Sequence, residues 1–217
     1  MDASAVISRL RSLGSSRNVA GQRRFGITPR TLHLGVPIPE LRRIARSHPN
    51  DHPLALALWS ANIHEARILA AYVDDPALVT ERQMDAWARG FDSWDVCDQV
   101  CSNLFDRTPH AVARAAAWSA RRPEFVKRAG FAMMACLAVH RRDLPDRVFL
   151  GFLPIIRREA HDGRNFVMKA ANWALRQIGK RNGRLRRAAV AEALRIARLG
   201  APSARWIASD ALRELGK

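Results

Sequence analysis

The sequence predicts an all-α protein, a solenoid built from antiparallel pairs of short helices. Apolar residues recur at the helical period through almost the whole chain, and no Asn-Gly or Asp-Gly pair lies between alternating apolar runs. Glycine and proline interrupt this pattern often, which leaves connections of two to five residues. Helices joined by such short turns pack as antiparallel pairs, and stacked pairs form a solenoid. An irregular helical bundle is the alternative.

In the N-terminal half, the first helix is expected over 3–13, where apolar side chains share one side. A connector rich in glycine and proline, 26–39, follows, and Pro39 lies in the first turn of a helix that ends near residue 47. Thr80 and Gln83 have the spacing of a capping box, and Ser93 is a favourable N-cap. Further helices are expected over 53–60, 62–73, 80–89 and 93–105.

In the C-terminal half, Pro154 should kink its helix or end it early, and Gly200 and Pro202 separate the last two helices. Helix pairs recur every 30–45 residues, within the range of HEAT-like repeats, although no strict sequence repeat is present. We therefore expect a right-handed superhelical solenoid of HEAT-like or ARM-type repeats that forms a single domain over 1–217. The helices are expected over 109–120, 123–141, 145–160, 165–180, 184–199 and 202–215.

The charge of the chain indicates a polyanionic partner. Of the 217 residues 36 are basic and 20 acidic, so the formal net charge is +16 and the sequence pI is about 11.5. Only four of the basic residues are lysines, and arginine suits bidentate contacts with phosphate. An arginine-rich proteome would explain part of the arginine excess, but it does not explain the net charge.

Composition also argues against several classes of protein. Three cysteines give no even disulfide framework, and 48% hydrophobic content argues against disorder. No opening apolar run resembles a signal peptide, and no stretch approaches the roughly 20 apolar residues that span a bilayer. We expect a cytoplasmic, nucleoid-associated monomer with no membrane partner.

Acidic residues gather in the middle of the chain. Residues 51–110 carry four basic and ten acidic side chains, whereas 1–50 carry nine and two and 111–217 carry twenty-three and eight. Within this middle, "FDSWDVCDQVC" (91–101) places three aspartates beside a tryptophan and two cysteines. Such an island in a basic chain is either ordinary surface or the place where the chemistry occurs.

In the helix expected over 93–105, Trp94 and Asp98 are four residues apart and share one face at the edge of a broad apolar arc. Asp98 should therefore be partly buried against an aromatic ring, where the pKa of a carboxylate can shift. The alternative is a carboxylate that pairs with an arginine for packing alone. Asp92 and Asp95 are expected near the first turn, which the helix dipole favours.

Two later helices carry cations in unusual settings. In 165–180, Trp173 projects opposite to the apolar face among Lys169, Arg176 and Lys180, as suits contact with sugar, base or phosphate, unless a neighbouring helix covers the ring. The helix 123–140 is apolar on all sides except for a few charges, so Lys127 and Arg128 should be buried and need partners. Either an internal carboxylate, with Asp98 as the candidate, or a bound phosphate would serve.

Other constellations are weak. Cys97 and Cys101 could both face a metal ion, but no third and fourth ligand has suitable spacing, so small buried thiols are favoured. The sequence has no phosphate-binding glycine loop, no Gly-x-Ser-x-Gly and no lysine in an obvious Schiff-base setting. We expect no cofactor, no metal and no lyase step. The basic amphipathic helix 184–198 is expected to contact phosphates rather than a membrane.

Five segments, in order, resemble the bacterial DNA alkylation repair (AlkD-like) glycosylase family. The resemblance runs from about residue 17 to residue 181. It implies a HEAT-like solenoid whose concave basic face cradles duplex DNA, and it implies excision of cationic N3- and N7-alkylated purines. The segments are "LGVPIPELRRIAR", "NIHEARILAAYVDD", "FDSWDVCDQVC", "EFVKRAGFAMMA" and "FVMKAANWALRQIGKRN".

The resemblance also implies roles for particular residues. The family's catalytic motif, a tryptophan with an aspartate four residues later and a second tryptophan on a later helix, matches Trp94, Asp98 and Trp173. Asp98 would stabilise the oxocarbenium that develops at C1′ of the sugar, and the two rings would hold the deoxyribose. The supporting arginine maps to Arg128. Contacts with double-stranded DNA are expected from Lys127, Arg128, Lys169, Arg176, Lys180 and Arg181.

Two other functions are compatible with the sequence. One is a non-catalytic solenoid that binds distorted or branched DNA, because the family contains members that bind DNA without glycosylase activity. The other is a scaffold for protein interactions. DNA binding should weaken steeply with salt, whereas binding by a scaffold should depend little on it.

Overall fold

The all-α prediction is confirmed. In the computed structural model residues 2–216 are described, and they form thirteen α-helices and one short 3-10 helix without a β-strand. The helices gather into two compact units, one that ends at Thr108 and one that begins at Pro109. The expectation of a single domain over 1–217 stays a prediction.

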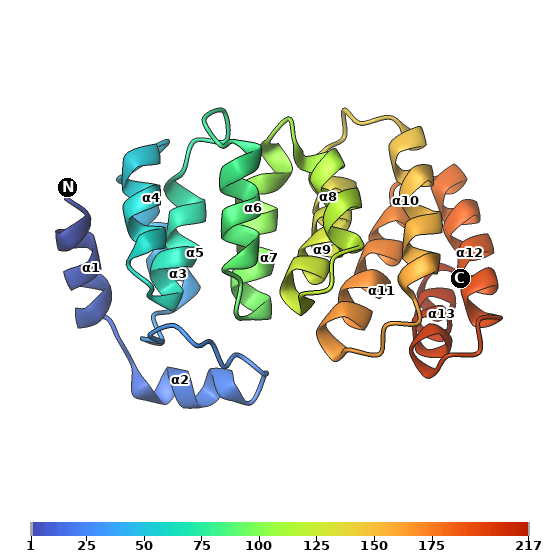
Figure 1. Cartoon of the computed structure of the whole chain (residues 1–217), viewed down its shortest axis with the longest axis horizontal. Helices are drawn as coiled ribbons and strands as arrows, with labels where there is room; N and C mark the ends of the chain where they lie inside the picture. The colour runs from blue at the N-terminus through green and yellow to red at the C-terminus, as the bar shows by residue number, and fades with distance from the viewer. Residues whose placement is uncertain (1, 217) are drawn as a thin grey trace. The chain divides into compact units, whose positions relative to one another are not determined.

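The first unit contains seven α-helices and the 3-10 helix, coloured blue to green in Figure 1. The helix α5 packs against α3, α4 and α7, and α4 and α5 form an antiparallel pair. Aromatic rings join α4 to α6, because Trp59 and Trp87 stack with their ring centroids 4.2 Å apart. The helices are α1 (Ala3–Ser12), α2 (Ser16–Arg23), α3 (Ile38–Ala45), α4 (His52–Ser60), α5 (His64–Val73), α6 (Glu81–Arg89), α7 (Trp94–Asn103) and η1 (Phe105–Arg107).

The second unit contains six α-helices, in which α9 packs against both α8 and α11 (Figure 1). The helix α9 can approach α8 closely because Gly130 has no side chain. A Cβ atom there would lie 2.9 Å from the Ala115 carbonyl oxygen and closer still to the backbone of Ser119. The helices are α8 (Ala111–Ser119), α9 (Glu124–His140), α10 (Asp146–Glu159), α11 (Asn165–Gly179), α12 (Gly183–Ala197) and α13 (Pro202–Leu215).

One helix of the first unit was not expected. The helix α2 lies between the expected first helix and the connector, and none of its residues is buried. It therefore has no apolar face whose period a sequence pattern could reveal. Its start is fixed locally instead, because the Ser15 hydroxyl oxygen accepts a hydrogen bond from the backbone N–H of Asn18.

Three expectations about helix ends are corrected. The helix α10 does not end early at Pro154, since it continues to Glu159; Pro154 is exposed, so water can bond the carbonyl that a proline leaves unpaired. The Thr80 hydroxyl caps α6 by accepting from the Gln83 backbone N–H, but the Gln83 side chain donates to Asp74 instead of completing the capping box. Ser93 occupies the N-cap position of α7 without a side-chain cap, because its hydroxyl donates to Asp95.

Between residues 2 and 216, no helix is both long and apolar enough to cross a bilayer.

Candidate active site and nucleic-acid interface

The helix α7 presents Trp94 and Asp98 at the edge of its buried face, as the sequence predicted. Both side chains are half-buried. The apolar arc behind them is buried completely, with no exposed surface on Val96, Cys97, Val100, Cys101, Leu104 and Phe105. The indole Nε1 of Trp94 donates a hydrogen bond to the Phe25 carbonyl oxygen at 3.0 Å, which ties the ring to the chain just after α2.

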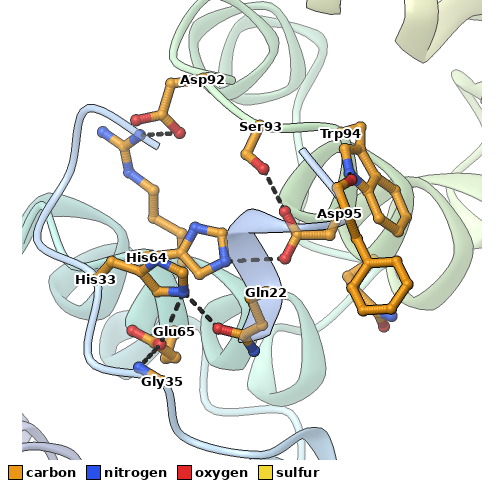
Figure 2. A network of polar contacts seen from close by, with 12 residues as sticks. Gln22, His33, Gly35, His64, Glu65, Asp92, Ser93, Trp94 and Asp95 are labelled. Atoms are coloured by element: carbon orange, nitrogen blue, oxygen red, sulfur yellow. Dashed lines mark hydrogen bonds and ion pairs between the residues drawn. The ribbon is translucent and has the colours of Figure 1, made fainter. Parts of the chain in front are cut away.

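The two other aspartates of this segment have different structural partners: Asp92 bonds the connector, and Asp95 bonds α5 (Figure 2). The Asp92 carboxylate accepts from the backbone N–H groups of Arg30 and Thr31 at 2.9 and 3.0 Å and lies 3.8 Å from the Arg67 guanidinium. We expected Asp92 to favour the start of α7 through the helix dipole. The structure instead shows that Asp92 holds Arg30 and Thr31, which lie about 60 residues earlier in the chain.

Asp95 belongs to a buried network with His64 (Figure 2). One Asp95 carboxylate oxygen lies 2.9 Å from Nε2 of His64, and the other accepts from the Ser93 hydroxyl. Burial alone would raise the pKa of Asp95, but the hydrogen bonds from His64 and Ser93 outweigh it and hold that pKa below its usual range. Burial likewise opposes a charged His64 ring, but Asp95 and the nearby carboxylates raise the pKa of His64.

The neighbouring Glu65 occupies a nest of backbone N–H groups. Its carboxylate, 1% exposed, accepts from Leu34 at 3.0 Å, Gly35 at 2.5 Å and Val36 at 3.3 Å. Gly35 has a φ of 77°, which a glycine adopts without strain. Glu65 and Asp92 thus hold the connector in place, and the connector itself makes a strand-like contact with Ile63 through Leu32.

In the second unit Trp173 lies half-buried on α11, opposite the buried apolar side of that helix. Lys169, one turn earlier, is exposed and has no ion pair within the described part of the chain. The two other cations of this face are paired with α13. Arg176 lies 3.5 Å from Asp210 and 2.5 Å from Glu214, and Lys180 also pairs with Glu214. Lys180 and Arg176 together lower the pKa of Glu214.

The cations of α9 are buried, as predicted, but Lys127 has partners other than the one we expected. Lys127 lies 2.8 Å from Glu159 at the end of α10 and 3.1 Å from Asp162. We had expected Asp98 to be the carboxylate that pairs with it. The Arg128 guanidinium donates to the Phe166 carbonyl oxygen at 2.6 Å. The pairing of Arg128 with Asp98, and the contact of Lys127 with DNA, stay predictions.

Arg181 holds the segment that follows α9. Its guanidinium lies 4.0 Å from the centroid of the Phe149 ring, and it donates to the carbonyl oxygens of Ala138 at 2.7 Å and of Arg141 and Leu144 at 3.3 Å. This arrangement closes the C-terminal end of α9 and fixes the 141–147 loop. Contact between Arg181 and DNA stays a prediction.

The three cysteines, Cys97, Cys101 and Cys136, form no disulfide and are buried, as small apolar side chains are. Over residues 2–216, no cluster of three or more His, Cys, Asp or Glu side chains could hold a metal ion.

Comparison with known proteins identifies the family. The family model described as DNA alkylation repair enzyme matches residues 6–215. The chain belongs to the DNA alkylation repair enzyme family. A search of curated proteins gives no match.

A solved structure supports the HEAT-like assignment for this member of the DNA alkylation repair family. It matches with a TM-score of 0.81 at 21% identity over 100% of this chain and 97% of its own. That structure is described as a new family of proteins related to the HEAT-like repeat DNA glycosylases with affinity for branched DNA structures. The likeness shows that the two chains share the HEAT-like repeat fold.

Some residues that hold the candidate site in place were not expected from the sequence. His64 and Glu65 adjoin in sequence and resemble no metal motif, so nothing marked them as the centre of a buried network. Phe25 is 74% exposed on the segment whose carbonyl holds Trp94, and Arg23, Arg24 and Arg30 around it are exposed as well. The sequence did contain one signal for Phe25, because an aromatic residue within an arginine-rich segment is unusual enough to be noted.

Proposed function

We propose that this member of the DNA alkylation repair family hydrolyses the N-glycosidic bond of cationic N3- and N7-alkylated purines in duplex DNA. The observation that carries the proposal is the pair on α7: Trp94 and Asp98 lie one turn apart and half-exposed, and a hydrogen bond to Phe25 holds the indole ring. The other aspartates of this segment have structural roles, because Asp92 accepts from the connector backbone and Asp95 bonds His64 on α5.

The chemistry requires only one carboxylate. A purine alkylated at N3 or N7 is already positive, so no acid need protonate it before it departs. When the bond between C1′ and the purine nitrogen breaks, the electron pair neutralises the base and positive charge develops on the sugar. Asp98 would stabilise that charge and orient a water molecule, which adds to C1′ and releases a proton. The products are a neutral alkylated base and an abasic site.

The tryptophans and the cations would bind the substrate. The ring faces of Trp94 and Trp173 suit contact with deoxyribose and exclude bulk water. Lys169 is exposed and unpaired within the described part of the chain, so it is available to phosphate directly. Arg176 and Lys180 would reach phosphate by releasing or sharing Glu214, and Arg128 would support Asp98. Action on chromosomal DNA would place the protein at the nucleoid.

The test is single-turnover release of N7-methylguanine from duplex DNA. Asp98→Asn preserves the shape of the side chain and removes its charge, so we expect release to fall about 10²–10³-fold, the loss typical of removing one transition-state electrostatic contact. Affinity for undamaged DNA should hold or rise, since one charge that repels phosphate is gone. Asp75→Asn, on the loop after α5, is the matched control and should release base at the rate of the unchanged protein. Equal rates in the Asp98→Asn and unchanged proteins would remove Asp98 from the mechanism.

A second candidate function is binding of branched or distorted DNA without catalysis. The observation that favours it is the affinity for branched DNA with which the structurally similar protein is described. The same assay separates the two, when it is joined to binding measurements with a four-way junction and a linear duplex of equal length. No base release together with tighter binding to the junction would establish the second function and refute the first.

A further inference from the structure

A hollow of about 400 Å³ opens in the first unit, where the C-terminal ends of α3, α5 and α7 lie close together. Three arginines line it. Arg42 belongs to the last turn of α3, Arg46 follows that helix directly, and Arg107 ends η1. The asparagines Asn50 and Asn103 and the phenol of Tyr72 complete its polar lining. We call this hollow the arginine pocket.

The three arginines of the pocket lack ion-pair partners in the part of the chain that the structure describes. All three side chains are exposed. The contrast with Arg43, their neighbour on α3, is direct, because Arg43 donates to Glu40 at 2.9 Å. The negative ends of three helix dipoles favour arginines at this place, but a dipole end carries only about half a charge and does not neutralise a guanidinium group.

One acidic residue lines the pocket, and it is already engaged. Asp74 is 4% exposed. Its carboxylate lies 2.6 Å from Nδ1 of His52 and 2.7 Å from the Gln83 amide nitrogen, and it accepts from the backbone N–H of Asp75 at 2.8 Å. Asp74 therefore faces its own partners, and the pocket keeps a net positive charge.

A fixed polar layer lies beneath the arginines. The Tyr72 hydroxyl donates to the Gln99 side-chain oxygen at 2.6 Å, and the Asn103 amide donates to the Gln99 carbonyl at 2.8 Å. The Arg42 guanidinium carbon lies 5.9 Å from the centroid of the Tyr72 ring. This polar layer is thus ordered by its own hydrogen bonds, and Arg42, which also bonds the Tyr72 phenol, is exposed like Arg46 and Arg107 and has guanidinium donors left for an anion.

We propose that the arginine pocket binds a phosphate group of nucleic acid together with its attached sugar. The planar guanidinium fork matches phosphate oxygens in a bidentate manner, and three unpaired forks around one hollow fit a phosphate better than a carboxylate. A volume of about 400 Å³ exceeds what one phosphate fills and leaves room for the attached sugar. The proposal rests on the proposed function in taking DNA as the ligand, and it adds a phosphate site on the first unit to the contacts expected from the second.

The test compares two double variants of the full chain by fluorescence anisotropy with an undamaged labelled duplex over a range of salt concentrations. R42A/R107A removes two arms of the pocket. R82A/R89A removes two exposed arginines of α6, which line no part of the pocket and also lack ion pairs in the described chain. We expect R42A/R107A to weaken binding about tenfold and to lower the salt slope by about 1–2, and the control to change affinity less than about twofold. Equal losses in both variants would overturn the proposal.

Two further arms identify the source of the phosphate. If the pocket takes a terminal phosphate, a duplex with 5′-phosphate ends binds more tightly than one with 5′-hydroxyl ends, and R42A/R107A abolishes the difference. If it takes an internal phosphodiester, R42A/R107A weakens both duplexes alike. R42K/R107K keeps the positive charges and should recover part of the affinity, and thermal melting of each variant should match the unchanged protein because the side chains are exposed. No effect of R42A/R107A on either duplex refutes the site.

Base release by the unchanged protein, measured in parallel, tests the proposed hydrolysis separately. A protein that releases no base but binds through the arginine pocket would refute the hydrolysis and support the pocket. A protein that binds no DNA would overturn both.

Discussion

Removal of the Glu65 carboxylate should destabilise the protein far more than removal of an exposed glutamate. Glu65 is 1% exposed and accepts from the backbone N–H groups of Leu34, Gly35 and Val36. Gly35 and Val36 are buried, whereas Leu34 is half-exposed and can turn to water. In Glu65→Ala two buried donors lose their acceptor at about 1–3 kcal/mol each, so the free energy of unfolding should fall by about 2–6 kcal/mol.

Two further variants make the Glu65 prediction sharp. Glu65→Gln keeps one acceptor oxygen and loses the charge, so it should cost about 1–2 kcal/mol. Glu40→Ala breaks an exposed pair with Arg43 and should cost about 0–1 kcal/mol. Urea unfolding followed by circular dichroism gives the midpoint shift at constant m-value. A Glu65→Ala protein within about 1 kcal/mol of Glu40→Ala would refute the reasoning that the nest holds the connector.

Three other predictions concern Trp173, Glu214 and His64. Trp173→Ala should reduce base release with little change in melting temperature, because Trp173 is half-exposed on α11; a loss of about 3–5 kcal/mol would instead mark it as a core residue. Glu214→Gln should tighten DNA binding and steepen its salt slope, because it frees Arg176 and Lys180; an unchanged slope would show that these cations do not contact phosphate. The pKa of His64 is raised in the folded protein, so His64 stabilises it fully below about pH 6.5 and loses that contribution as pH rises through its raised pKa. The stability difference between the unchanged protein and His64→Gln should therefore shrink from pH 6 to pH 9, and a difference that grows would contradict this sign.

The arrangement of helices was largely predictable because the helical period is a local property. Each expected helix is present, and the last one spans 202–215 as expected. The buried arc of α7, which fixes where Trp94 and Asp98 project, also follows from counting residues at 100° per step. The helix α2 was not predicted because it buries no residue and therefore shows no apolar period in its sequence.

The partners of charged side chains were not predictable, because they depend on which helices meet in space. Lys127 and Glu159 are 32 residues apart, and Arg176 and Glu214 are 38 apart. In a chain with 36 basic and 20 acidic residues, sequence separation does not indicate which oppositely charged residues will pair.

The sequence by itself determined the helical class, the polyanionic partner that its charge implies, and the faces on which Trp94, Asp98 and Trp173 lie. Only the tertiary structure decided that Asp92 and Glu65 hold the connector and that Asp95 bonds His64. It also decided that Glu214 pairs with two cations of α11 and that three arginines of the first unit have no ion pair around one hollow. The physical reason is that a helical face follows from neighbours three and four residues away, whereas an ion pair or a nest of N–H groups forms only after distant segments have packed.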